Sequence, residues 1–186
     1  MPRNVEIKAA VPALTPVVDA LSSLAHPAPE TLVQEDTFFV CSAGRLKLRR
    51  LSPSRGELIH YVRADETGPK ESCFTRVPTS EPDLLRDALA RAYGTAGIVR
   101  KHRVVYLVGR TRVHLDQVEG LGSFVELEVV LDESESTDAA IREARALMIA
   151  LGLRDDQLVS GAYVDLLRAR AAPLSVPSCS SGTRAP

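Results

Sequence analysis

The sequence has little cysteine, few aromatic residues and no long apolar run. Its three cysteines, Cys41, Cys73 and Cys179, lie far apart and form no C-x-x-C pair. This spacing excludes the usual zinc and redox motifs and favours a reduced, intracellular chain. No stretch approaches the roughly 20 apolar residues that cross a bilayer, and the first residues contain no apolar signal region. We therefore expect a soluble, cytoplasmic protein without a membrane partner.

The sequence also lacks an excess of charge of either sign. Its 23 Lys and Arg nearly balance its 24 Asp and Glu, which gives a formal net charge of −1. A chain without a basic excess is not typical of nucleic-acid binding, so we expect no nucleic-acid partner. Its 186 residues, 45% of them hydrophobic, suffice for one domain with its own core. We place this domain at residues 1–170 and expect the Pro-, Ser- and Gly-containing tail, 171–186, to be disordered.

Alternation of apolar and polar residues predicts strands through much of the chain. These strands are expected at 3–11, at three places within 31–63, near 73–77, and at 97–109, 110–118 and 122–131. Helical spacing predicts helices at about 12–24, 82–93 and 136–151, with a short one at 162–168. Short turn signals separate most neighbouring strands. The order predicts an α+β protein with an antiparallel sheet.

What the sequence does contain is charge repeated at two-residue spacing within the predicted strands. Alternate residues of a strand share one face, so these charges should line a single surface of the sheet. The candidate set is Glu6, Lys8, Arg45, Lys47, Arg49, Arg63, Lys101, Arg103, Arg112, Asp116, Glu126 and Glu128.

A solvated outer face is the ordinary explanation of such a pattern, because antiparallel sheets commonly expose one face to water. Such faces usually include Thr, Ser, Gln and Asn, whereas these positions are almost uniformly Arg, Lys, Asp and Glu. Crowded charges of like sign repel one another, and this is costly unless a ligand of opposite charge neutralises them. A polyphosphate would neutralise the arginines and lysines, and a divalent cation would neutralise the carboxylates. Oxygen ligands favour Mg²⁺ or Mn²⁺ over Zn²⁺.

Five segments, in order, resemble those of the CYTH superfamily, also called triphosphate tunnel metalloenzymes. They are Asn4–Lys8, Arg45–Arg49, Lys101–Tyr106, His114–Val118 and Gly122–Glu128, and the similarity covers residues 3 to about 167. The superfamily includes class IV adenylyl cyclases, thiamine triphosphatases and inorganic triphosphatases. The resemblance implies a closed antiparallel eight-stranded β-barrel with flanking helices, whose lumen binds a triphosphate with metal.

The resemblance also implies a role for each charged position. Glu6, Asp116, Glu126 and Glu128 would hold the metal ion, either Mg²⁺ or Mn²⁺. Lys8, Arg45, Lys47, Arg49, Arg63, Lys101, Arg103 and Arg112 would bind the phosphates, and Lys8, Glu6 and Arg49 would take part in catalysis. One position departs from the family pattern E-x-E-x-K, because residue 4 is asparagine. Asn4 offers an oxygen without charge, which leaves open whether one or two metal ions bind.

The expected activity is hydrolysis of a nucleoside, thiamine or inorganic triphosphate. One alternative is a class IV adenylyl cyclase that forms cyclic AMP and pyrophosphate from ATP, and another is a non-catalytic module that binds polyphosphate or nucleotide. Only 4% of the residues are aromatic, which offers few partners for a base. Phe38, Phe39 and Tyr61 are candidates, although each also fits a barrel wall, and Tyr163 either closes one mouth of the tunnel or packs a helix. Whether the chain is a monomer or a homodimer stays open.

Overall fold

A computed structural model describes residues 2–26, 28–132 and 134–171. The strands are β1 (Arg3–Val11), β2 (Glu30–Phe39), β3 (Arg45–Ser52), β4 (Arg55–Arg63), β5 (Lys70–Thr79), β6 (Thr95–Val108), β7 (Thr111–Val118) and β8 (Gly122–Leu131). The α-helices are α1 (Thr15–Leu21), α2 (Pro82–Tyr93), α3 (Thr137–Ala150) and α4 (Tyr163–Ala171), and a 3₁₀ helix, η1, spans Asp155–Gln157.

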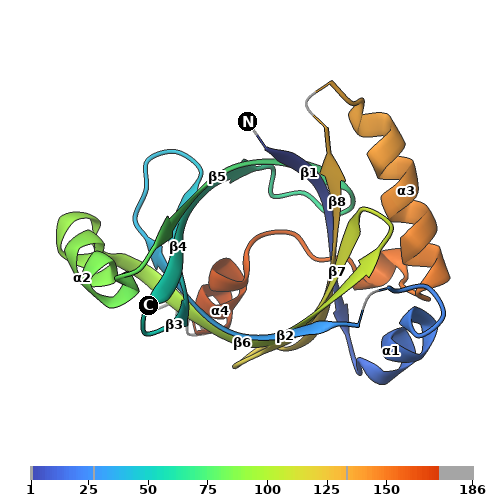
Figure 1. Ribbon diagram of the computed structural model, residues 1–186, viewed down its shortest axis with the longest axis horizontal. Coiled ribbons are helices and arrows are strands. Elements are labelled where there is room, and N and C mark those ends of the chain that lie inside the picture. The colour runs from blue at the N-terminus through green and yellow to red at the C-terminus, as the bar shows by residue number, and fades with distance from the viewer. Residues whose placement is uncertain (1, 27, 133, 172–186) are drawn as a thin grey trace, which may run out of the picture.

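The strands form one closed antiparallel barrel in the order β1-β5-β4-β3-β2-β6-β7-β8. The first strand closes the ring, because β1 pairs with β5 along one edge and with β8 along the other. Figure 1 looks through this ring, with α1, α2 and α3 outside it. The predicted α+β class and the closed eight-stranded barrel with flanking helices are confirmed.

The alternation read from the sequence divides the residues between the two sides of the barrel wall. Val5 and Ile7 of β1 and Leu127 and Val129 of β8 point outward and are buried against α3 and α1. Their neighbours in sequence, among them Glu6, point into the lumen. The main apolar core therefore lies outside the barrel, and the lumen remains charged.

Gly44 fixes where the basic strand β3 begins. Its φ is +65°, a conformation that favours glycine, and an added Cβ would lie 2.5 Å from the carbonyl oxygen of Tyr61 on β4. Only glycine fits a chain that turns this closely over its neighbour. The turn sets the alternation that follows, which brings Arg45, Lys47 and Arg49 to the inner face of the barrel.

A second apolar cluster closes part of one end of the barrel. Tyr163 and Val164 of α4 pack with Phe38, Val99 and Phe124 from the strands, and each of these side chains is buried. Figure 1 shows α4 within the outline of the ring. The two alternatives for Tyr163 thus describe one arrangement, because helix packing itself places the ring at this end.

The predicted elements differ from the structure mainly at their ends. Strand β2 begins at Glu30, one residue before the 31–63 stretch in which three strands were expected, and α1 is shorter than the predicted 12–24 helix. The 3₁₀ helix was not predicted. Ala171 belongs to α4, and the rest of the predicted tail, 172–186, lies outside the described residues together with Cys179. Among the described residues, no helix is long and apolar enough to cross a membrane.

Candidate functional site

The barrel encloses a charged cavity with about 90 Å³ of free space at its centre. Its wall includes Glu6, Lys8, Lys47, Arg49, Arg63, Lys101, Arg103, Glu126 and Glu128. Arg112 lines the mouth at the end away from α4, and Arg45 lines a groove beside α4. Asp116 lies beneath Arg103 and is 0% exposed. The structure thus places the predicted site residues along the lumen and its mouth, with Asp116 buried behind Arg103 and Arg45 in the neighbouring groove.

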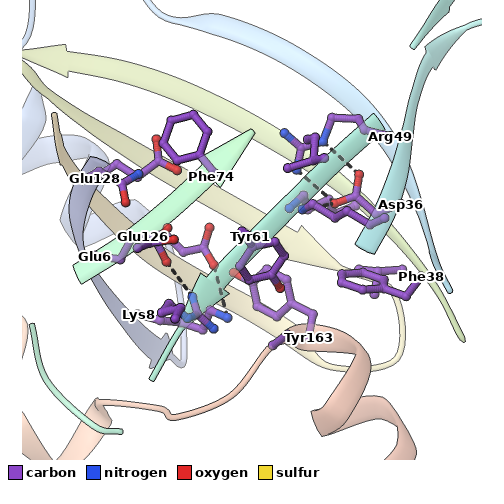
Figure 2. Close-up of a pocket in the computed structure, with 18 of the residues that line it drawn as sticks. Glu6, Lys8, Asp36, Phe38, Arg49, Tyr61, Phe74, Glu126, Glu128 and Tyr163 are labelled. Carbon is purple, nitrogen blue, oxygen red and sulfur yellow. Dashed lines mark hydrogen bonds and ion pairs between the residues drawn. The ribbon is translucent and has the colours of Figure 1, made fainter. Parts of the chain in front are cut away.

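The three glutamates predicted to hold metal lie on β1 and β8, on one side of the cavity (Figure 2). The strand register sets Glu6 opposite Glu128 and Lys8 opposite Glu126. Arg63 donates to Glu6 at 2.6 Å, and the Lys8 Nζ lies 3.3 Å from Glu126 Oε1. Burial would raise the pKa of Glu126, but the positive charges of Lys8 and Arg103 hold that pKa well below its usual range. Its carboxylate is therefore ionised at neutral pH.

Asp36 on β2 is a site residue that the sequence analysis missed. It is 2% exposed, and its Oδ1 accepts a hydrogen bond from Arg49 Nε at 2.8 Å (Figure 2). Its Oδ2 accepts from Arg49 Nη2 at 2.9 Å and from Lys47 Nζ at 2.8 Å. Burial would raise its pKa, but Arg49 and Lys47 hold it well below the usual range. The signal was present in the sequence, because Gln34, Asp36 and Phe38 follow a two-residue alternation within the stretch predicted to hold strands.

Asp116 on β7 has a similar arrangement. Its Oδ1 accepts a hydrogen bond from Arg103 Nε at 2.6 Å. Its Oδ2 accepts from Arg103 Nη2 at 2.5 Å and from the Tyr163 hydroxyl at 2.9 Å. Lys101 Nζ lies 3.6 Å away. Burial would raise the pKa of Asp116, but Arg103 and Lys101 lower it. Because both oxygens already accept from buried side chains, this geometry favours positioning of Arg103, and metal ligation by Asp116 stays a prediction.

Burial acts on the lysines in the opposite direction. It lowers the pKa of Lys8 and of Lys47, and it lowers the pKa of Lys101 to about 7. Neighbouring arginines add to this effect, whereas Glu126, Asp36 and Asp116 offset part of it. A bound polyanion would raise these pKa values again, so the protonation of these amines is coupled to ligand binding.

The donor atoms fit a hard divalent cation. Asn4 is 3% exposed, lines the cavity, and its Oδ1 has no hydrogen-bond partner among the described residues. An unpartnered buried oxygen is costly unless a ligand meets it. Asn4, Glu6, Glu126 and Glu128 together offer oxygen donors only, the set that Mg²⁺ and Mn²⁺ prefer. No group of three Asp, Glu, His or Cys side chains in the described ranges is already in metal-binding geometry.

Oxygens of α4, of the segment before it and of the loop between β4 and β5 pair with several of the cations. The Gly161 carbonyl oxygen accepts hydrogen bonds from Lys8 Nζ at 3.0 Å and from Arg63 Nη2 at 2.9 Å. Arg45 Nη2 lies 2.8 Å from the carboxylate of Asp165 and 2.5 Å from the carboxylate of Asp65. These oxygens hold the side chains in place, and phosphate oxygens are chemically equivalent partners for them.

Aromatic rings also line the cavity, but cations face them. Lys47 Nζ lies 5.5 Å from the ring centre of Phe38 and 5.7 Å from that of Tyr61, and Lys8 Nζ lies 4.1 Å from that of Tyr163. These contacts attract a cation to the ring face. Each of the three rings thus faces a lysine inside the lumen. Phe38 on β2 and Tyr61 on β4 belong to the barrel wall, whereas Tyr163 belongs to α4.

Comparisons with known proteins agree with this geometry. The sequence model of the CYTH domain matches residues 2–163. A proposed adenylate cyclase of Methanocaldococcus jannaschii is 31% identical over 133 residues, which are 72% of this chain and 66% of that protein. The adenylate cyclase CyaB of Aeromonas hydrophila is 27% identical over 158 residues, 78% of this chain and 81% of its own. The chain thus spans slightly less than two thirds of the archaeal relative.

Solved structures share the fold at lower identity. The PH1012 protein of Pyrococcus horikoshii superposes with a TM-score of 0.77 at 19% identity, over 88% of this chain and 99% of that one. A proposed adenylyl cyclase from Hippeastrum, described as revealing a dominant triphosphatase activity, superposes with a TM-score of 0.65 at 15% identity, over 91% and 96% of the two chains. At these identities the likeness shows the barrel fold.

Proposed function

The chain belongs to the CYTH domain family, whose enzymes act on triphosphates with divalent metal ions, and on that premise we propose that it is a metal-dependent triphosphate hydrolase. The substrate is a nucleoside, thiamine or inorganic triphosphate held in the barrel. The metal is Mg²⁺ or Mn²⁺, bound by Glu6, Glu126 and Glu128, with the Asn4 oxygen as a neutral donor.

The observation that carries this proposal is the mutual pairing of acids and bases inside the lumen. Arg63 pairs with Glu6, and both Lys8 and Arg103 pair with Glu126. A triphosphate with a divalent cation can replace all of these partners at once. Each basic side chain exchanges a carboxylate for a phosphate oxygen, and each carboxylate exchanges a basic side chain for metal. A polyanion without metal would leave the glutamates beside its own negative charge.

In this reaction, water attacks the terminal phosphorus, the anhydride bond to the next phosphate breaks, and orthophosphate and a diphosphate leave. The metal ion, when bound, neutralises charge on the phosphate oxygens. Arg49 and Lys47, fixed by Asp36, stabilise the charge that develops on the diphosphate. Lys8 and Glu6 orient the water.

The second candidate is the class IV adenylyl cyclase, which the names of the two sequence relatives favour. In that reaction the ribose 3′-hydroxyl attacks the α-phosphorus and pyrophosphate leaves. The same cations would serve, so the two reactions differ in how the organic group is held. The engagement of Phe38, Tyr61 and Tyr163 by lysines argues against a stacking site for adenine within the lumen and favours hydrolysis.

The test is to incubate the protein with inorganic triphosphate, thiamine triphosphate or ATP, with Mg²⁺, with Mn²⁺ and with a chelator. We expect orthophosphate that depends on metal. Cyclic AMP with pyrophosphate would establish the cyclase instead, and tight binding without any product would indicate a binding module. Turnover that survives chelation would contradict the role of the glutamates.

Adjacent arginines on β3 provide a matched control. Arg49 points into the lumen, whereas Arg50 pairs with Asp83 of α2 outside it. We expect Arg49→Gln to lower kcat/KM by roughly 10²-fold, because it removes a charge-assisted contact to phosphate, and Arg50→Gln to change it less than about 2-fold. Equal effects of the two substitutions would place the reaction outside the lumen.

A further inference from the structure

His114 on β7 places an imidazole ring among the carboxylates of the lumen. The strand register sets His114 opposite Glu126 of β8, and it shares the inner face of β7 with Arg112 and Asp116. The residue is 5% exposed. Together with Glu128, it lines a second cavity of about 240 Å³, at the end of the barrel away from α4. The ring is therefore buried in protein but borders a space that a small ligand can enter.

The ring nitrogens of His114 lie too far from the neighbouring carboxylates for hydrogen bonds. Nδ1 is buried and has no hydrogen-bond partner among the described residues. It lies 3.8 Å from Glu126 Oε2, and Nε2 lies 4.0 Å from Glu128 Oε2, both beyond the roughly 3.2 Å of a hydrogen bond. Glu126 Oε2 instead accepts from Arg103 Nη2 at 2.6 Å. A buried polar atom without a partner is costly, so we expect a bound group at this ring.

The charges beside the ring favour a cation as that group. An anion at the ring would lie next to both Glu126 and Glu128, which repel it. The ion pair of Glu128 with Arg112 is long, at 3.4 Å, so the Glu128 carboxylate can turn toward the ring. Two donor atoms bound to one octahedral ion at about 2.1 Å lie about 3 Å apart. Side-chain movements of about 1 Å would therefore bring His114 and the two glutamates to a shared ion.

We propose that His114 is a nitrogen ligand of the divalent cation, beside Glu126 and Glu128, and that it makes the site prefer Mn²⁺ to Mg²⁺. This inference deepens the proposed function, because it takes the glutamates to hold the metal ion. Imidazole nitrogen binds first-row transition metal ions, whereas Mg²⁺ keeps to oxygen ligands and water. The other donors, Asn4 and the glutamates, offer oxygen atoms that serve both ions, so the discrimination comes from the nitrogen.

Pulsed electron paramagnetic resonance of bound Mn²⁺ tests the ligand directly, because it detects coupling between the metal and a coordinated imidazole nitrogen. The samples contain Mn²⁺ alone and Mn²⁺ with a methylene-bridged triphosphate analogue, which contains no nitrogen and is not hydrolysed. We expect nitrogen coupling in the unmodified protein, with a different pattern when its histidines carry ¹⁵N. His114→Phe, which keeps a ring without a donor atom, should abolish the coupling.

Metal affinity tests the selectivity separately. The signal of free Mn²⁺ gives the dissociation constant of Mn²⁺, and competition gives that of Mg²⁺. We expect Mn²⁺ to bind about 10-fold more tightly than Mg²⁺, the order of magnitude that one residue of a metal site contributes. His114→Asn supplies an amide oxygen close to the position of Nδ1, so it should bring the ratio of the two constants close to 1. A thermal melt of each substituted protein shows whether the fold is retained.

His102 of β6 provides the matched control, because it is exposed on the outer side of the barrel, so His102→Asn should leave both coupling and ratio unchanged. Bound Mn²⁺ without nitrogen coupling, coupling that persists in a folded His114→Phe protein, or absence of bound Mn²⁺ would overturn the ligand. An unchanged ratio in His114→Asn would overturn the selectivity. Metal-dependent hydrolysis without nitrogen coupling would retain the proposed function and remove this ligand. Nitrogen coupling without turnover of any triphosphate would retain the ligand and remove the hydrolase.

Discussion

The two halves of the barrel wall are built differently. Strands β1, β7 and β8 carry all four predicted metal-binding carboxylates on their inner face, and their outer face is buried under α1 and α3. Strands β2 to β5 carry Arg45, Lys47, Arg49 and Arg63 inside, but their outer face is only partly covered, and Val62 and Val77 are 54% and 51% exposed. We call these the acidic half and the basic half.

This difference matches what each half has to bind. A metal ion requires its ligands within a few tenths of an ångström, and a packed core behind a strand limits how far its side chains can move. Long arginine and lysine side chains can follow a flexible phosphate chain, so their strands need less support. Each half also has its own buried fixing point, because Asp36 on β2 holds Lys47 and Arg49, and Asp116 on β7 holds Arg103.

The largest effect should come from removing a carboxylate of the acidic half. We predict that Glu128→Gln lowers metal-dependent turnover by about 10³-fold, because the charge stabilisation that metal supplies is worth several kcal/mol. Steady-state rates over a range of Mg²⁺ concentrations measure it. The exposed Glu119, on the turn between β7 and β8, serves as control, and Glu119→Gln should retain full activity.

A folded Glu128→Gln protein with normal turnover would contradict the division of the barrel into an acidic and a basic half. Circular dichroism and a thermal melt of the substituted protein show whether the fold is retained. The expected melting temperature is close to the original, since glutamine fills the same volume.

Asp116 provides the next test, because it separates positioning from metal binding. Removing its charge leaves Arg103 and Lys101 without their buried partner, and breaking such a pair costs about 3–5 kcal/mol. We predict that Asp116→Asn lowers the free energy of unfolding by this amount, measured by denaturant titration, while the Mg²⁺ concentration that gives half-maximal turnover stays within about 3-fold. Asp36→Asn, its counterpart in the basic half, should instead raise KM for the triphosphate.

A large rise in the Mg²⁺ requirement of Asp116→Asn would show that this carboxylate ligates metal, as the family resemblance predicted. The geometry instead favours a structural partner of Arg103, since Tyr163 and Arg103 already occupy both oxygens.

The charged face of the sheet was predictable because a period of two survives in the sequence wherever one wall face is apolar and the other charged, whereas the closed barrel was implied by the resemblance to the CYTH superfamily. Which charges pair across the lumen was not predictable, because those contacts join strands far apart in sequence. Arg63 and Glu6, 57 residues apart, are an example. Asp36 lies within the 31–63 stretch that was predicted to hold three strands, but it was not included in the candidate set. Asn4 was recognised as a departure, but only its burial shows an oxygen without a partner.

Outside the lumen, the comparison predicts unequal tolerance of large-to-small substitutions. Leu127 on the outer face of β8 is 0% exposed, whereas Val62 on the outer face of β4 is 54% exposed. We predict that Leu127→Ala lowers the free energy of unfolding by about 2–5 kcal/mol and Val62→Ala by less than about 0.5 kcal/mol. Denaturant titration of the two proteins measures this. Similar losses would show that the basic half is supported by a partner, such as a second copy of the chain.

The smallest expected effect concerns Lys101 on β6, the strand that joins the two halves. Burial lowers its pKa from an ordinary value of 10.5 to about 7. The folded protein thus binds fewer protons than the unfolded chain between these two values, and this lysine makes stability rise with pH through that window. A bound triphosphate raises the pKa again. We predict uptake of up to about one proton per triphosphate at pH 8, but not at pH 6, where Lys101 is already charged.

Calorimetry of triphosphate binding in two buffers of different ionisation enthalpy measures this uptake, and Lys101→Met should reduce it at pH 8 while leaving pH 6 unchanged. Burial also lowers the pKa of Lys70, to about 8, so Lys70→Met is the control for uptake from a second lysine. If Lys101→Met takes up as many protons as the unmodified protein, the amine is already charged before the ligand arrives. In that event Asp116, at 3.6 Å, outweighs the burial of Lys101, and the joining strand belongs electrostatically to the acidic half.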